Sequence, residues 1–340
     1  MSLAPRSWFA PWSNGVYSVS PALRPLGTDY GNGDADGRLI LIDQDFHRYR
    51  ANKDAAYAED RSKYWTQVEG FSESRTLGRG SSTVLSPPKT STTLAACRAI
   101  ATRLATDYPS FFVFESDVLT NGLTRERVAW NADGTLDKTR SILPPDVDHP
   151  LEALALQIQC DLALIVRKLD GRDYNAAIHL CAPSHWAAAD KIGRSFFQVH
   201  AGIPGFEKVN AVARGLVDAM ICRKSLVRFV WGVESDDRLN HHPAAPPKLD
   251  QAEWDGRNFE SGKFWVRTER QTTLGMPDVD AALFFIHVQT VPGNVVLQMS
   301  ELRESLRAGL LSMSPEARRY KGLEPGFDRL IGILDSVRSE

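Results

Sequence analysis

Apolar positions in the second half of the chain form short runs or alternate with polar positions, a spacing typical of strands. Four segments have this pattern, at residues 174–181, 226–233, 263–273 and 281–291. The cluster Asp278-Val279-Asp280 predicts a turn before the last of them. Successive strands with a few short helices between them predict an α+β domain with an antiparallel sheet.

Helical periodicity predominates in other parts of the chain. Residues 150–167 place Leu151, Leu154 and Ile158 on one stripe that continues through Leu162, so this segment is predicted to be one helix. The other predicted helices lie at residues 46–65, 94–106, 300–307 and from 315 onward.

Three other segments show neither a long strand pattern nor helical periodicity. Residues 39–42 form an apolar run that predicts a short strand, and residues 240–250 are rich in proline and predict a loop. Residues 70–93 contain few apolar side chains among Ser, Gly, Thr and Pro, and we expect a mobile surface loop there.

The order of these elements predicts three parts. Residues 1–150 form an N-terminal extension packed on the main domain, residues 151–300 form that domain, and residues 301–340 form closing helices.

Residues 182–205 contain the most informative local pattern. Ser184 is expected to cap a short helix that Gly193 ends, and a second helix runs from Arg194 and stops before Gly202. His200 falls on the last turn of the second helix.

Phe196 and Phe197 precede His200 by four and three residues, so they share its face. A histidine at an apolar helix end is one way to hold a haem iron. The alternative is a hydrogen-bonded structural histidine.

Composition narrows the possible functions. The chain is 43% hydrophobic, enough for a sizeable core, and its net charge of −2 without a long basic stripe argues against a nucleic-acid partner. The four cysteines form no Cys-X-X-Cys pair, which argues against a zinc or iron–sulfur site and favours a reduced, cytoplasmic protein. The N-terminus lacks a signal-peptide core, and the best apolar run, 281–286, is too short to span a membrane.

Other candidate motifs are weaker. The chain has no Gly-X-Gly-X-X-Gly and no P-loop, so flavin, NADPH and folate sites are expected elsewhere. His241-His242 suggests a metal site, but the sequence offers no second pair of ligands near it. Cys181 beside His179 or His185 suggests thiol catalysis, but no arrangement of a base and a residue that orients it supports this. His179 and His287 lie in predicted strands and are candidates to line a pocket.

Ordered blocks of residues resemble one known family. They are Leu23–Leu26, Pro183-Ser184-X-Trp186, Lys191-X-Gly193, Val199-His200-X-X-Ile203-Pro204-Gly205, Val227-Arg228-X-X-Trp231, Val266–Thr272 and Tyr320-Lys321-Gly322-Leu323. Together they resemble the catalytic subunit of haem-dependent oxidative N-demethylases. The resemblance covers most of residues 161–323.

The resemblance implies a PAS-like fold with the cofactor between short helices and the sheet. It implies haem b, dioxygen, a small secondary or tertiary amine such as dimethylamine, and release of formaldehyde. Electrons would come from a flavin and iron–sulfur reductase subunit, and tetrahydrofolate-linked formaldehyde capture would occur on another subunit. The alternatives are a haem gas or redox sensor without turnover, or a haem-free scaffold subunit.

The resemblance also implies roles for individual residues. His200 would bind the iron as a neutral imidazole, with Phe196, Phe197 and Ile203 as apolar walls. Lys191 would reach a haem propionate or interact with a helix end, and Trp186 would pack in the core.

Two strand positions carry the remaining expectations. Arg228 interrupts an apolar strand and would polarise oxygen on the distal side, unless it is an outward-facing arginine. Glu269 would hold the amine or fix Arg228, unless it belongs to a surface ladder of salt bridges. Arg267 or Arg270 is a candidate to neutralise a haem propionate.

Overall fold

The computed structural model describes residues 2–20, 22–71, 91–206, 213–255, 257 and 259–336. The predicted mobile loop at 70–93 falls mostly at 72–90, outside the described residues. Its last part is helical, because Ser91 caps a helix that begins at Thr92, two residues before the predicted start.

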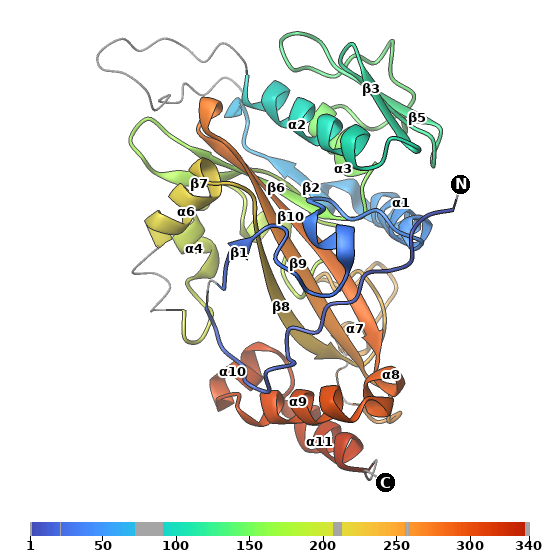
Figure 1. Cartoon of the computed structure of the whole chain (residues 1–340), viewed down its shortest axis with the longest axis vertical. Helices are drawn as coiled ribbons and strands as arrows, with labels where there is room; N and C mark the ends of the chain where they lie inside the picture. Colours follow the sequence, from blue (N-terminus) through green and yellow to red (C-terminus); the bar gives the residue numbers. More distant parts are fainter. Residues whose placement is uncertain are drawn as a thin grey trace.

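A seven-stranded antiparallel sheet organises the molecule (Figure 1), in the order β1-β8-β9-β10-β6-β7-β2. The sheet and helices confirm the α+β class. Its strands are β1 Arg24–Pro25, β2 Trp65–Gln67, β6 Asp161–Arg167, β7 Asp173–His179, β8 Leu226–Glu234, β9 Trp265–Met276 and β10 Ala281–Pro292. The four strands and the turn at 278–280 predicted from the second half are therefore confirmed, within a few residues at the ends.

A second, smaller sheet was not predicted. It is a meander of β3 Phe112–Glu115, β4 Val118–Asn121 and β5 Glu126–Ala129. Each of its strands has only four residues, too short for a clear alternation.

Helices surround the two sheets (Figure 1). They are α1 Phe46–Tyr64, α2 Thr92–Asp107, α3 Pro150–Ala155, α4 Phe196–His200, α6 Ala213–Cys222, α7 Gln251–Asp255, α8 Gly293–Gln298, α9 Ser300–Leu311, α10 Pro315–Tyr320 and α11 Phe327–Ser336. Among the described residues, no helix combines the length and the apolar character that a membrane span requires.

The predicted helix at 150–167 is wrong beyond its first six residues, since α3 ends at Ala155 and β6 begins at Asp161. Both faces of β6 are buried, so its apolar run lacks the polar positions that distinguish a strand from a buried helix. The buried ammonium of Lys53 donates to the carbonyl oxygens of Ala155 at 2.7 Å and Ile158 at 2.8 Å, which satisfies backbone groups between the two elements.

The predicted strand at 39–42 is also wrong. The segment is buried, but side chains serve its backbone instead of a neighbouring strand. The Thr272 hydroxyl donates to the carbonyl of Leu39, and the Tyr108 hydroxyl donates to the carbonyl of Ile40. These hydrogen bonds replace a strand ladder.

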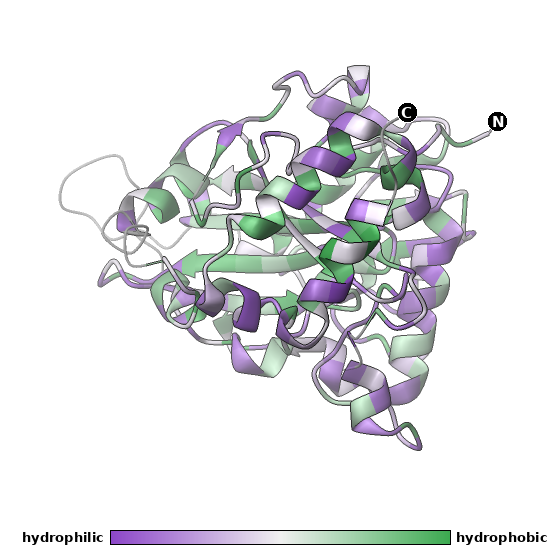
Figure 2. Cartoon of the chain, turned by 90° about the horizontal axis from the view of Figure 1, so that it is seen from below, coloured by the Kyte–Doolittle hydropathy of each residue, from purple (hydrophilic) through white to green (hydrophobic). Residues whose placement is uncertain are grey.

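The large sheet separates two environments. On one face, α2, α3 and the small sheet close a large apolar core that includes Leu164 and Phe285. On the other face, α6 packs against β9 and β10, and α4 lies against β7. Gly275 permits the close approach of α6, because a Cβ there would collide with the carbonyl oxygen of Ile221. Figure 2 shows the hydrophobic strands inside a surround of more polar helices and loops.

Candidate functional site

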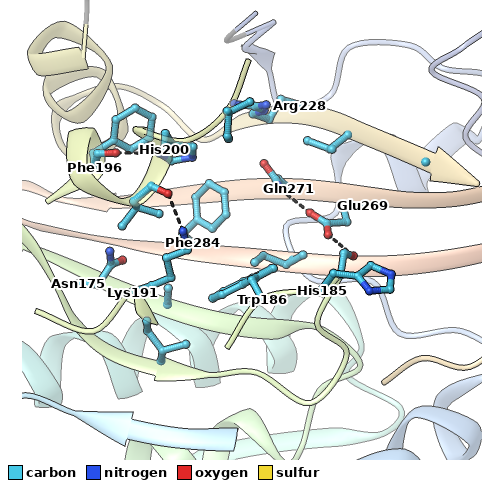
Figure 3. A pocket seen from close by; sticks show the side chains of 18 of the residues that line it. Asn175, His185, Trp186, Lys191, Phe196, His200, Arg228, Glu269, Gln271 and Phe284 are labelled. Atoms are coloured by element: carbon cyan, nitrogen blue, oxygen red, sulfur yellow. Dashed lines mark hydrogen bonds between the residues drawn. The ribbon is translucent and has the colours of Figure 1, made fainter. Parts of the chain in front are cut away.

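A cavity lies on the sheet face that α4 and α6 cover (Figure 3). Strands β6 to β10 contribute side chains to it, and α4, α6 and the end of α10 contribute others. Residues from distant parts of the sequence therefore meet in one place.

His200 faces this cavity from the last position of α4. Ser195 begins the helix with a reciprocal capping box to Gln198, which explains why so short a helix forms. The Nδ1 atom of His200 lies 2.7 Å from the carbonyl oxygen of Phe196. A carbonyl only accepts, so the proton is on Nδ1 and the Nε2 lone pair has no partner among the described residues.

The electrostatic surroundings keep the His200 ring neutral. Burial lowers the pKa of His200 to about 4, the hydrogen bond to Phe196 opposes this shift, and the charge of Arg228 adds to it. The ring stacks on Phe206 with 4.8 Å between ring centroids. A neutral, oriented imidazole with a free Nε2 is the form that binds a metal.

Arg228 faces the same cavity from β8 (Figure 3). Phe229 lies on the opposite face, where it packs on Phe9, as strand alternation predicts. The Nε atom of Arg228 is buried and has no hydrogen-bond partner in the described part of the chain. Burial lowers the pKa of the guanidinium, and the nearby Glu269 offsets part of this effect. A buried donor without an acceptor is costly, so this position favours an added acceptor.

Glu269 lies on β9 directly opposite Val230 of β8 and also lines the cavity. Its carboxylate accepts from the Ser184 hydroxyl at 2.5 Å and from the Gln271 amide at 2.7 Å. Only 9% of Glu269 is exposed, so the surface salt-bridge ladder is excluded.

One family profile matches residues 34–331, and the family is described as haem-dependent oxidative N-demethylase, alpha subunit-like. The chain belongs to this family. A search of curated proteins found no match. The family description implies haem dependence and an oxidoreductase-type reaction, and its designation as an alpha subunit implies partner subunits.

The cavity of this N-demethylase-like chain fits a haem group by its own chemistry. It offers one imidazole nitrogen with a free lone pair, and apolar side chains of Phe196, Ile203 and Phe284 line the same space. The unpartnered Nε of Arg228 supplies a donor for an oxygen ligand or a carboxylate.

Two residues expected beside the haem do not line the cavity. Phe197 is 51% exposed, because a five-residue helix turns it away from the sheet while Phe196 packs inward. Arg270 lies on the opposite face of β9, where its Nη2 donates to the carbonyl oxygens of Asp36 and Arg38. That arginine fixes the N-terminal segment.

The arrangement around Lys191 also differs in part from expectation. Lys191 lines the cavity, but its Nζ donates to the carbonyl oxygen of Val199 at 2.7 Å and so supports the end of α4. Ser184 does not cap a helix, because its hydroxyl binds Glu269. Gly193 has a φ of +71°, the left-handed conformation expected at a helix end.

The other candidate histidines in strands lie away from the cavity. His179 and His287 are fully buried on the face of the sheet away from the cavity. The Nε2 atom of His179 lies 3.7 Å from Sγ of Cys181, and Nδ1 of His287 lies 3.8 Å from Sγ of Cys160. Burial raises the pKa of the Cys181 thiol, which opposes thiol catalysis.

His185, Glu234 and His241 are close enough to suggest a metal site. Their atoms are already engaged, however: His241 bonds Asp236 through Nε2 at 3.0 Å and accepts from Arg267 through Nδ1 at 3.2 Å. The adjacent guanidinium groups also repel a cation.

Sequence reasoning missed the C-terminal contribution to the cavity. Tyr320 and Lys321 line it, and Arg257 ion-pairs with Glu234 at 3.2 Å beside them. Tyr320 and Lys321 were part of the family motif, a signal that could have found them, whereas nothing marked Arg257. Phe284 and Ile286 alternate on β10, and that pattern identified the strand without identifying the cavity face.

Proposed function

We propose that this protein oxidatively removes a methyl group from a small secondary or tertiary amine, using haem b, dioxygen and electrons from another subunit. The observation that carries the proposal is one cavity that holds a neutral histidine with a free nitrogen, an unpaired arginine and a buried carboxylate. Each group suits one need of the reaction.

His200 would hold the haem iron through Nε2, and its Nδ1–H bond to Phe196 would fix the ring orientation. Haem bound there would supply the activation of dioxygen that amine oxidation requires. Phe196 and Ile203 would exclude water from that side of the cavity.

Arg228 would donate to the negative charge that develops as dioxygen is reduced. Its Nε is buried and has no partner among the described residues, so this donor needs no rearrangement to act. Glu269 would accept from the N–H of an ammonium-type substrate, while Ser184 and Gln271 hold its carboxylate in place.

The finer architecture is part of the same proposal. We assign residues 151–300 as a PAS-like haem domain, residues 1–150 as an extension packed on it, and residues 301–340 as closing helices. A flavin and iron–sulfur reductase subunit would supply electrons, and the location would be cytoplasmic.

The test is turnover by the purified, haem-loaded protein with a chemical or protein reductant. Dimethylamine and trimethylamine are supplied with dioxygen, and formaldehyde is measured against amine consumed. Equal amounts of formaldehyde and demethylated amine support the proposal. Haem binding without formaldehyde would identify a sensor, and absence of a Soret band would identify a scaffold.

A further inference from the structure

Lys321 lies in the cavity wall just after α10, and contacts with neighbouring segments fix its position. Arg257 donates to the backbone carbonyl of Lys321 and ion-pairs with Glu234 of β8, which ties this turn to the sheet. Gly322 has a φ of +65°, and a Cβ there would collide with the Arg257 guanidinium. The lysine stem lies against Gly232 of β8.

The amine of Lys321 is uncommitted. Within the described residues it makes no hydrogen bond or ion pair, whereas the amine of Lys191 in the same cavity donates to Val199. Burial lowers the pKa of Lys321; the carboxylates of Glu269 and Glu234 oppose this shift, and the guanidinium groups of Arg257 and Arg228 add to it. A desolvated lysine amine is a nucleophile toward carbonyl carbon.

The position also suits a product on its way out. Tyr320, next to Lys321, lines the cavity and is 49% exposed, so the cavity wall meets solvent here. A small aldehyde that forms near Glu269 and leaves past Tyr320 would pass the Lys321 amine.

We propose that Lys321 captures the aldehyde product of demethylation, an inference that rests on the proposed function. The Nζ lone pair forms a bond to the carbonyl carbon, the C=O π electrons move to oxygen, and a proton from Nζ ends on that oxygen as a carbinolamine. Loss of water gives an imine, and water later reverses both steps to release the aldehyde. No oxidant or reductant is required.

The test adds formaldehyde and cyanoborohydride to the haem-loaded protein at neutral pH, without amine or turnover. Hydride converts the imine to a stable methyl-lysine, and peptide mass spectrometry measures methylation of each lysine. We expect Lys321 to be methylated faster than the exposed Lys263, because its buried amine has a lowered pKa and is uncharged in a larger fraction of molecules at neutral pH. Lys191 is the matched control, because burial lowers its pKa as well but its amine donates to Val199, and it should react more slowly than Lys321.

The outcome is independent of whether the protein demethylates amines, because the aldehyde is added directly. Lys321→Arg keeps the stem and charge, and should abolish methylation at this site without changing that of Lys263. Methylation of Lys321 no faster than that of Lys263 would overturn the proposal. Methylation confined to haem-free protein would also overturn it, because the amine would then pair with a haem carboxylate.

Discussion

Arg228 and Arg267 lie on neighbouring strands of the cavity face, and Arg270 lies on the opposite face of the sheet. Arg267 donates to the carbonyl oxygens of four residues, which are Ala182, Pro183, Arg238 and Leu239. Arg270 donates to two carbonyls of the N-terminal segment. Arg228 makes no hydrogen bond with any described residue.

The three arginines differ in how far the described residues satisfy them: Arg270 serves carbonyls through Nη2 although its buried Nε has no partner, whereas Arg228 serves none. Burial lowers the pKa of all three guanidinium groups, so burial alone does not separate structure from function. The hydrogen bonds separate them, because a guanidinium surrounded by carbonyls holds segments together, and an unpaired one is available to a ligand.

The largest effect is expected at Arg228. Arg228→Ala should keep its haem and lose about 10²–10³-fold in the rate of amine oxidation, because one preorganised donor to a developing charge is lost. Arg228→Lys should recover only part of the rate, since it keeps the charge without the planar fork. The assay is formaldehyde release at saturating amine, and a parental rate in Arg228→Ala would show that the residue is structural.

Arg267 should show the opposite behaviour. Arg267→Met should lower the free energy of unfolding by about 3 kcal/mol or more, because it leaves buried carbonyls without donors. Arg228→Met, the matched control, should lower it by less than about 1 kcal/mol, since its guanidinium satisfies no protein group. Denaturant titration of both variants measures the difference, and equal losses would remove the contrast.

The sequence predicted those parts of the molecule whose pattern of apolar and polar residues fits only one type of secondary structure. Strands β8, β9 and β10 alternate or run long enough to be recognised, and α4 lies within the helix predicted to run from Arg194 and stop before Gly202. Segment 150–167 failed because β6 is buried on both faces, and a continuous apolar run also fits a helix. Only tertiary contacts, such as Lys53 with the carbonyls of Ala155 at the end of α3 and Ile158 beyond it, decide between them.

The cavity was predictable where one local segment carries it. His200, Phe196 and Ile203 come from a single stretch of sequence, and all line the cavity. Arg270 and Phe197 were misplaced, because which face of an element meets the cavity depends on packing against distant segments. Arg257 had no local signal, since its role comes from its contacts with Glu234 and Lys321.

The side of the sheet away from the cavity should govern sensitivity to acid. His149 caps α3 by accepting the N–H of Leu151 through Nδ1 at 3.2 Å, and burial lowers its pKa to about 4. The neutral His149 contributes fully to the free energy of unfolding above its unfolded pKa of about 6.5. This contribution is lost as the pH falls towards 4, because the unfolded state takes up the proton first.

His149→Asn keeps a capping side chain without the titration. Between pH 7 and pH 4 this variant should lose about 2 kcal/mol less unfolding free energy than the parent, a value discounted for the partial exposure of His149. Urea titrations at a series of pH values measure this, and parallel pH profiles would disprove the role of His149.

The smallest effect is expected at Glu269. Glu269→Gln should raise the KM for the amine about tenfold with a smaller change in kcat, because a charge-assisted hydrogen bond to an ammonium becomes a neutral one. The pair Ser184 and Gln271 should still hold the side chain in place. An unchanged KM would separate Glu269 from substrate binding.

The most direct test of the account is the absorption spectrum of haem-loaded protein with and without His200. We expect a Soret band with one haem per chain in the parent, and loss of both in a folded His200→Ala variant, since Nε2 of His200 is the proposed iron ligand. His185→Ala is the matched control, because His185 lines the same cavity but is paired with Glu234 at 3.2 Å, and it should retain haem. Unchanged haem content and an unchanged Soret band in folded His200→Ala would contradict the central claim.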